Sequence, residues 1–124
     1  MTEGDSPVRP ELTRSEERSW RMHSRLSELL TQADLEQWRP VVKRNLERLR
    51  SAVRGQVHLR NIDRWESLLD RSDMPGLHRA LTGLDRDSTE MREVSPFAGL
   101  LPEEDRLGIL QAMAREREAR QADS

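Results

Sequence analysis

The strongest constraint on the fold is an apolar period that runs from residue 35 to residue 53. Six apolar residues recur there every three or four positions: Leu35, Trp38, Val42, Leu46, Leu49 and Val53. At about 100° per residue they fall within an arc of roughly 80°, which is the pattern of a helix with one buried face. The pattern predicts a long helix that must pack against other elements.

The apolar residues elsewhere in the chain also recur at helical spacing. Beside the long helix, the expected helices are about 14–31, about 58–71, 75–82, a short one that opens at Asp87-Ser88-Thr89-Glu90, and one that has Pro102 at its first position. No stretch alternates between apolar and polar residues for long enough to predict a strand. The sequence therefore predicts an all-α single domain, an irregular bundle of four to six helices.

Residues at the expected helix ends support these boundaries. Thr13 and Glu16 form the T-x-x-E signature of a capping box, and Asp34 is expected to cap the long helix. Pro40 either opens that helix or kinks it, because proline lacks the backbone donor that a helix interior requires. Gly55 is a natural helix stop, so the long helix is expected to end just before it.

Composition divides the chain of 124 residues into three parts. Residues 1–12 hold two prolines, a glycine and no periodic apolar pattern, so a flexible tail is expected. The helical domain is expected over 13–115, and the mostly charged residues 116–124 are expected to fray. Because hydrophobic residues make up only 34% of the chain, it can bury one modest core.

The residue inventory argues against most enzyme classes. The absence of cysteine excludes a disulfide scaffold, a thiolate zinc site and a cysteine nucleophile. There is no glycine-rich phosphate loop, no G-x-S-x-G and no H-E-x-x-H motif, and the acid pairs are explained as helix caps. The three histidines, which lack metal-ligand spacing and are expected at the surface or on helix flanks, are His23, His58 and His78. We expect no enzyme activity, no metal site and no cofactor.

The location of the protein is predicted from two missing signals. No apolar run approaches the roughly 18 residues of a membrane span, so no membrane partner is expected. The first residues have neither the basic nor the apolar region of a signal peptide. The sequence thus predicts a cytoplasmic protein.

A basic segment at residues 39–60 is the first candidate for a binding surface. It carries seven basic residues and one acid, a formal charge of +6 in a chain whose net charge is −2. Opposite the apolar stripe, one flank holds Arg39, Lys43, Arg50 and Arg54, and the other holds Arg44 and Arg48. Three interpretations stay open: a solvated face that pairs with acids of other helices, a surface for an acidic protein partner, or a surface for nucleic acid. The interleaved tryptophans are expected in the core rather than exposed for base stacking.

The segment S-P-F-A-G-L-L-P at 95–102 is the second candidate. It is apolar, yet its two prolines and its glycine fit neither the helical nor the strand period. We expect Phe97, Leu100 and Leu101 to project together, and Arg92 to bond the carbonyls that Pro96 leaves unpaired. The segment is either a core plug that closes the bundle or an exposed knob, anchored by Phe97, for the groove of a partner. The exposure of Phe97 distinguishes the two.

Two motifs lie in the second half of the chain: Trp65-Glu66-Ser67-Leu68-Leu69-Asp70 and the stretch from Arg92 to Leu101. They match the pattern W-E-x-L-L-D followed by R-x-x-S-P-F-A-G-x-L, and so this half resembles a family of small helical proteins of high-GC bacteria. The likeness takes in Asn45-Leu46-Glu47-Arg48-Leu49 and covers roughly residues 35–112. Its members are often short proteins encoded near toxin–antitoxin or regulatory genes. The resemblance implies an interaction role and carries over no functional residue.

These observations predict a non-enzymatic protein-interaction module, as an antitoxin or a regulatory subunit. Its partner would bind the 95–101 segment, the basic face, or both. The alternative is a DNA-associated transcriptional regulator that uses residues 39–60, or a helix-turn-helix-like pair of helices over 58–82. A homodimer also stays open, because amphipathic helices of this size often associate.

Overall fold

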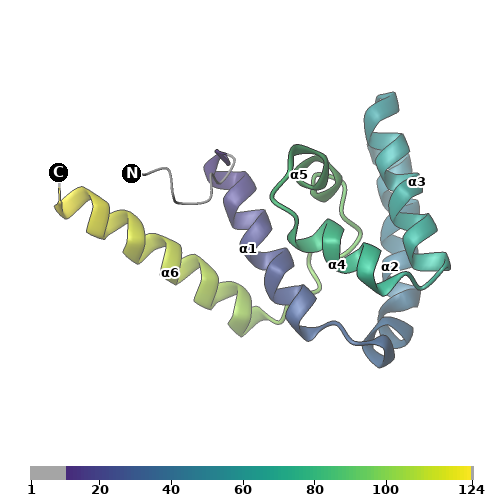
Figure 1. Cartoon of the computed structure of the whole chain (residues 1–124), viewed down its shortest axis with the longest axis horizontal. Coiled ribbons are helices and arrows are strands. Elements are labelled where there is room, and N and C mark those ends of the chain that lie inside the picture. Colours follow the sequence, from purple (N-terminus) through teal and green to yellow (C-terminus); the bar gives the residue numbers. More distant parts are fainter. Residues whose placement is uncertain (1–10, 124) are drawn as a thin grey trace, which may run out of the picture.

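The computed structural model describes residues 11–123, which form six helices and no strand (Figure 1). In chain order these are α1 (Arg14–Leu29), α2 (Gln32–Ala52), α3 (Gln56–Asp70), α4 (Met74–Thr82), α5 (Arg86–Arg92) and α6 (Glu103–Ala122). The predicted all-α bundle of four to six helices is confirmed. Of the tail expected at 1–12, residues 1–10 lie outside the described residues.

Capping side chains explain where the first two helices begin. The Thr13 hydroxyl accepts from the Glu16 amide at 3.1 Å, and the Glu16 carboxylate accepts from the Thr13 amide at 3.0 Å, as the capping box predicts. The start expected at Asp34 is wrong, because Thr31 caps α2 and Asp34 is its third residue. Thr31 and Asp34 form a second capping box, so α2 begins well before Pro40, which lies exposed inside the helix and does not open it.

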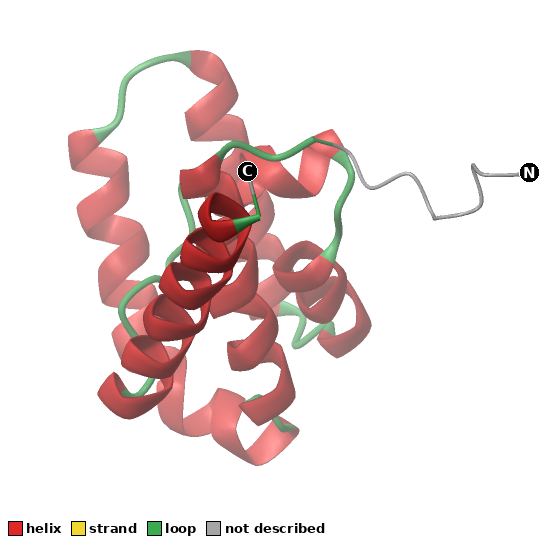
Figure 2. Cartoon of the chain, turned by 90° about the vertical axis from the view of Figure 1, so that its left-hand side faces the viewer, coloured by secondary structure: helices red, strands yellow, loops and turns green. Residues whose placement is uncertain are grey.

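The order of the helices along the long axis of the molecule differs from their order in the chain (Figure 1). Helices α1 and α6 lie at one end, the α2–α3 pair lies at the other, and α4 and α5 lie between them. Turned by 90°, the view of Figure 2 has α6 running across the front of the molecule. Because α4 contacts α1, α3 and α5, it occupies the centre of the bundle, with Leu77 and Leu81 fully buried.

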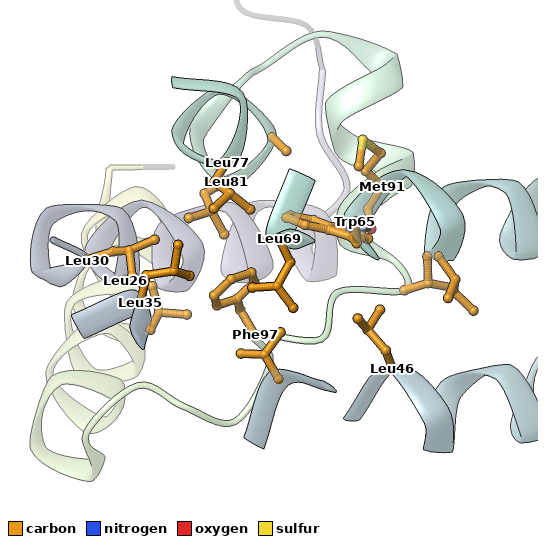
Figure 3. Close-up of a cluster of buried hydrophobic side chains, with 14 of the residues drawn as sticks. Leu26, Leu30, Leu35, Leu46, Trp65, Leu69, Leu77, Leu81, Met91 and Phe97 are labelled. Atoms are coloured by element: carbon orange, nitrogen blue, oxygen red, sulfur yellow. Dashed lines mark hydrogen bonds between the residues drawn. The ribbon is translucent and has the colours of Figure 1, made fainter. Parts of the chain in front are cut away.

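The segment after α5 is a plug in the hydrophobic core. Phe97 is 1% exposed, and its ring lies 5.7 Å from that of Trp65 at an angle of 57°. Figure 3 shows the Phe97 ring directed toward Leu69 and Trp65. Asn45 of α2 donates a 2.9 Å hydrogen bond to the carbonyl of Pro96 and so fastens this segment to the long helix. Of the two interpretations of 95–102, the geometry agrees with the core plug.

Side chains from distant helices satisfy the carbonyls at several helix C-termini, which have no partner within their own helix. The bonds are Trp20 to Thr82 (2.9 Å), Arg92 to Ala80 (3.0 Å), Trp65 to Met91 (2.8 Å) and Arg39 to Leu69 (2.6 Å). The sequence predicted that Arg92 bonds the carbonyls beside Pro96. That prediction is wrong, because Arg92 bonds the Ala80 carbonyl near the end of α4 instead. The three tryptophans are not alike either: Trp65 is fully buried, whereas Trp20 and Trp38 are half-buried.

The last helix is longer than the sequence suggested. It begins after Pro102, which stands at the cap position instead of the first helical position, and it continues to Ala122. Within the segment 116–124, Glu116 is paired with Arg21 of α1 at 2.6 Å, and the fraying expected there stays a prediction. No helix in the described part of the chain is long and apolar enough to cross a membrane.

Candidate functional site

One flank of the basic helix α2 is neutralised by α3. Lys43 lies 2.5 Å from Asp70 and 3.6 Å from Glu66, and Arg50 bonds Asp63 at 2.6 Å and also Glu66. The hydrogen bond with Asp70 raises the pKa of Lys43, and that with Asp63 raises the pKa of Arg50. Two of the four basic residues selected from the sequence therefore stabilise the α2–α3 pair.

The other two selected basic residues differ from each other. Arg39 is half-buried and donates to the Leu69 carbonyl and, at 2.9 Å, to the Ser72 hydroxyl, so it closes the end of α3. Arg54 follows the end of α2, is exposed, and has no ion pair within residues 11–123. The structure does not gather Arg39, Lys43, Arg50 and Arg54 into one open cationic surface.

The opposite flank of α2, formed by Arg44 and Arg48, is open. Both side chains are exposed, and neither has an ion pair among the described residues. The sequence placed Arg44 and Arg48 on a separate flank, but they were not among the predicted binding residues. The acidic residues of α3 could have indicated that one flank of α2 is paired. Asp63, Glu66 and Asp70 recur at the i, i+3, i+7 spacing of one helix face. That acidic stripe can neutralise only one of the two flanks.

A shallow groove of about 250 Å³ adjoins the open flank. One side is a single face of α2, and the other is the start of the plug segment. Its lining residues are Asn45, Arg48, Leu49, Ala52, Ser95 and Ala98. Since Asn45 of α2 bonds the carbonyl of Pro96, α2 and the plug segment are held together beside this groove.

The predicted partner-binding residues of the plug segment are mostly inside the molecule. Phe97 and Arg92 are buried, Leu101 is 9% exposed, and Leu100 is half-buried against the core. Burial lowers the pKa of Arg92, whose guanidinium bonds the Ala80 carbonyl. The exposed residues of the segment are Ala98, Gly99 and Pro102, so a partner would meet these residues rather than Phe97.

The helix-turn-helix-like pair suggested over 58–82 has an unsuitable second helix. Helix α4 is covered by α1, α3 and α5, and of its nine residues only Pro75 and Arg79 are exposed. A recognition helix needs a free face that enters the major groove. The packing of α4 does not favour DNA recognition by this pair.

The histidines include one exception to the expected surface positions. His23 of α1 is 4% exposed, whereas His58 and His78 are half-buried. No three histidine, aspartate or glutamate side chains within residues 11–123 cluster in a way that could hold a metal ion. The sequence signal for the burial of His23 was weak, because its neighbours Met22 and Leu26 were the apolar residues that the helical period selected.

Comparison with known proteins adds no family or fold relative. No protein-family model, curated protein or solved structure matches the chain. The resemblance to the W-E-x-L-L-D family stays a prediction, and any function has to be inferred from the residues of this chain.

Proposed function

We propose that the protein is a non-enzymatic interaction module that binds an acidic, amphipathic segment of a protein partner on the open flank of α2. One observation carries the proposal: Arg44 and Arg48 are exposed and unpaired beside a groove, whereas Lys43 and Arg50 of the same helix are paired with α3. Of the two flanks of α2, only the one that pairs with α3 contributes ion pairs to the fold.

The groove favours a peptide that carries both carboxylates and an apolar anchor. Leu49, Ala52 and Ala98 supply an apolar lining, and a volume of about 250 Å³ accommodates one or two side chains. Carboxylates one helical turn apart on the partner would face Arg44 and Arg48, which are themselves one turn apart. This is the helix-in-groove mode of recognition, in which apolar anchors enter a groove and charges at its edge fix the register.

Nucleic acid is the weaker candidate for the same surface. Non-specific DNA binding depends on the number of phosphates that basic residues neutralise. Pairing with α3 withdraws Lys43 and Arg50 from that number, and Arg39 is held at the end of α3. An antitoxin or a regulatory subunit is the role in which a module of this kind would act.

The proposal is tested with a synthetic peptide of leucines and glutamates arranged as an amphipathic helix, together with a scrambled peptide of the same composition. Fluorescence anisotropy measures the binding of each peptide, and of a labelled DNA duplex, to the purified chain. The test variant is Arg44→Glu with Arg48→Glu. The matched control is Arg14→Glu with Arg18→Glu, two exposed arginines of α1 at the same spacing and without an ion pair in the described chain.

We expect the amphipathic peptide to bind more tightly than the scrambled one, and the α2 variant to lose at least about tenfold in affinity. The α1 variant should keep the affinity of the parent chain. Equal binding of the two peptides would overturn the proposal, because charge alone would then explain it. A DNA duplex that binds more tightly than either peptide, with a steep salt dependence and loss in the α2 variant, would establish the alternative.

A further inference from the structure

A pocket lies where α3, α4 and α5 meet, and all of its lining residues belong to these helices or to the turn between α3 and α4. Its volume is about 320 Å³, within the range of small-molecule sites. Helices α3 and α4 approach each other closely beside it, because Gly76 has no side chain: a Cβ at this position would lie 2.6 Å from Leu68 Cδ2.

The two carboxylates of the pocket are already used by the fold. Arg64 donates two hydrogen bonds to Asp87, at 2.9 and 2.7 Å, and this pairing lowers the pKa of Asp87. Asp73 caps α4, because its carboxylate accepts from the Gly76 amide at 3.0 Å. The charge of Arg64 is therefore balanced by Asp87, and Asp73 is held by the start of α4.

The other two arginines of the pocket, Arg71 and Arg79, are exposed and have no ion pair within residues 11–123. Arg71 donates from Nε to the Ser67 carbonyl at 3.3 Å, which leaves both of its terminal amino groups without a partner in the described chain. Three arginines against two aspartates give the lining a formal charge of +1. The two arginines without an ion pair can both face a ligand.

A phosphate monoester matches these groups better than a carboxylate. A guanidinium binds phosphate oxygens through two parallel N–H bonds, and a phosphate monoester has three terminal oxygens and a charge near −2 at neutral pH. It can therefore accept from Arg71 and Arg79 together, whereas a carboxylate has two oxygens and a single charge. Beside the arginines, Leu68, Ala80 and Met91 form an apolar wall that an organic group would cover.

We propose that this pocket binds a small organic phosphate monoester, with its phosphate between Arg71 and Arg79 and its organic group against Leu68. The organic group distinguishes this ligand from free phosphate. The second negative charge distinguishes it from the phosphodiesters of a nucleic-acid backbone, which carry one charge each. Because the pocket is formed by α3, α4 and α5 rather than by α2, this inference stands or fails independently of the interaction role.

The test compares phenyl phosphate with phenyl sulfate, which has a similar shape and a single charge, and with inorganic phosphate, which has no organic group. A ¹H–¹⁵N NMR titration of the full chain at constant ionic strength gives each affinity and locates the binding site. We expect phenyl phosphate to bind about fivefold more tightly than either of the others, because the sulfate lacks the second charge and inorganic phosphate leaves the apolar wall uncovered. The Nε–H resonances of Arg71 and Arg79 should shift on binding.

Two double variants assign the contacts. Arg71→Gln with Arg79→Gln should lower the affinity for phenyl phosphate at least about tenfold. Arg44→Gln with Arg48→Gln removes two exposed arginines from α2 and should leave this affinity unchanged. The proposal is overturned if phenyl phosphate gives no saturable shift, if it binds no more tightly than phenyl sulfate or inorganic phosphate, or if the two double variants lose affinity equally.

Discussion

The two flanks of α2 carry the same kinds of side chain and have different roles. On one flank Arg50 bonds two acids of α3, and on the other Arg48 has no ion pair in the described chain and lines a groove. Nothing in α2 itself distinguishes them. The difference is made by α3, whose acidic stripe can face only one flank. In a run of basic residues, therefore, only the side chains without an ion pair to another helix are candidates for a binding surface.

The other polar groups can be divided in the same way, into those with a partner inside the molecule and those without one. The indole N–H of Trp65 and the guanidinium of Arg92 bond helix-end carbonyls inside the molecule, and so are used by the fold. His23 falls between the two classes, because Nδ1 is satisfied by Ser19 and Nε2 is not. Polar groups that bond other parts of the chain should control stability. Polar groups that have no partner in the described chain should control binding.

The largest expected effect on stability is at Phe97, the buried side chain of the plug segment. Phe97→Ala should lower the free energy of unfolding by about 3–5 kcal/mol, because it removes a buried ring and leaves a cavity beside Trp65. Urea denaturation followed by circular dichroism measures the loss. The control is Leu107→Ala on α6, which is 42% exposed and should have little effect. A Phe97→Ala variant as stable as the parent chain would show that Phe97 is not part of the core, and the segment would again be a candidate binding surface.

The next effect is the response of stability to acid at His23. Its folded-state pKa is about 4, against an ordinary value of 6.5, because burial and the nearby charge of Arg92 disfavour the imidazolium. Between these values the unfolded chain binds one more proton than the folded chain, so stability falls as the pH drops from about 6.5 to 4. At about 1.4 kcal/mol per pH unit, the loss reaches about 3 kcal/mol.

Urea denaturation at a series of pH values measures this loss, and His23→Gln isolates it. The variant has no titrating ring, so its stability should change less across this interval than that of the parent chain. Arg92 of α5, whose charge acts on the ring, is present in both proteins. If the free energy of unfolding changed with pH in the same way for both proteins, the pKa of His23 would not be lowered by folding and the ring would be accessible to water.

The fold was largely predictable, because helical period and capping are local properties. The capping box at Thr13 and the apolar stripe of 35–53 needed no knowledge of the rest of the chain. The errors arose where a distant residue intervened. Arg92, for example, bonds the Ala80 carbonyl near the end of α4 instead of the carbonyls beside Pro96, a contact that local spacing does not indicate.

The candidate surfaces were less predictable for the same reason. The sequence placed Arg44 and Arg50 on opposite flanks correctly, but it could not say which flank α3 covers. Likewise, the period of α1 selected Leu26 as a core residue without showing that His23 is buried with it. Both features depend on how two helices pack, which helical period alone does not determine.

A smaller effect is expected for the paired flank of α2. Arg50→Gln should lower the free energy of unfolding by about 0.5–1 kcal/mol, because the ion pairs with Asp63 and Glu66 are partly exposed and screened by water. The loss should shrink at high salt. Urea denaturation at low and high ionic strength measures both effects. A variant that unfolds like the parent chain at low salt would show that the α2–α3 pairing contributes nothing, and the two flanks would then be equivalent.

The smallest expected effect on stability is the sharpest test of the comparison. Arg48→Gln should change the free energy of unfolding by no more than about 0.5 kcal/mol, because Arg48 is exposed and unpaired within residues 11–123. The same substitution should weaken the amphipathic peptide severalfold, whereas Arg50→Gln should leave its binding nearly unchanged. Measuring stability and peptide affinity on both variants gives a crossed pattern if the flanks are specialised. Should Arg48→Gln cost more stability than Arg50→Gln, the open flank would be part of the scaffold, and the partner would have to bind elsewhere.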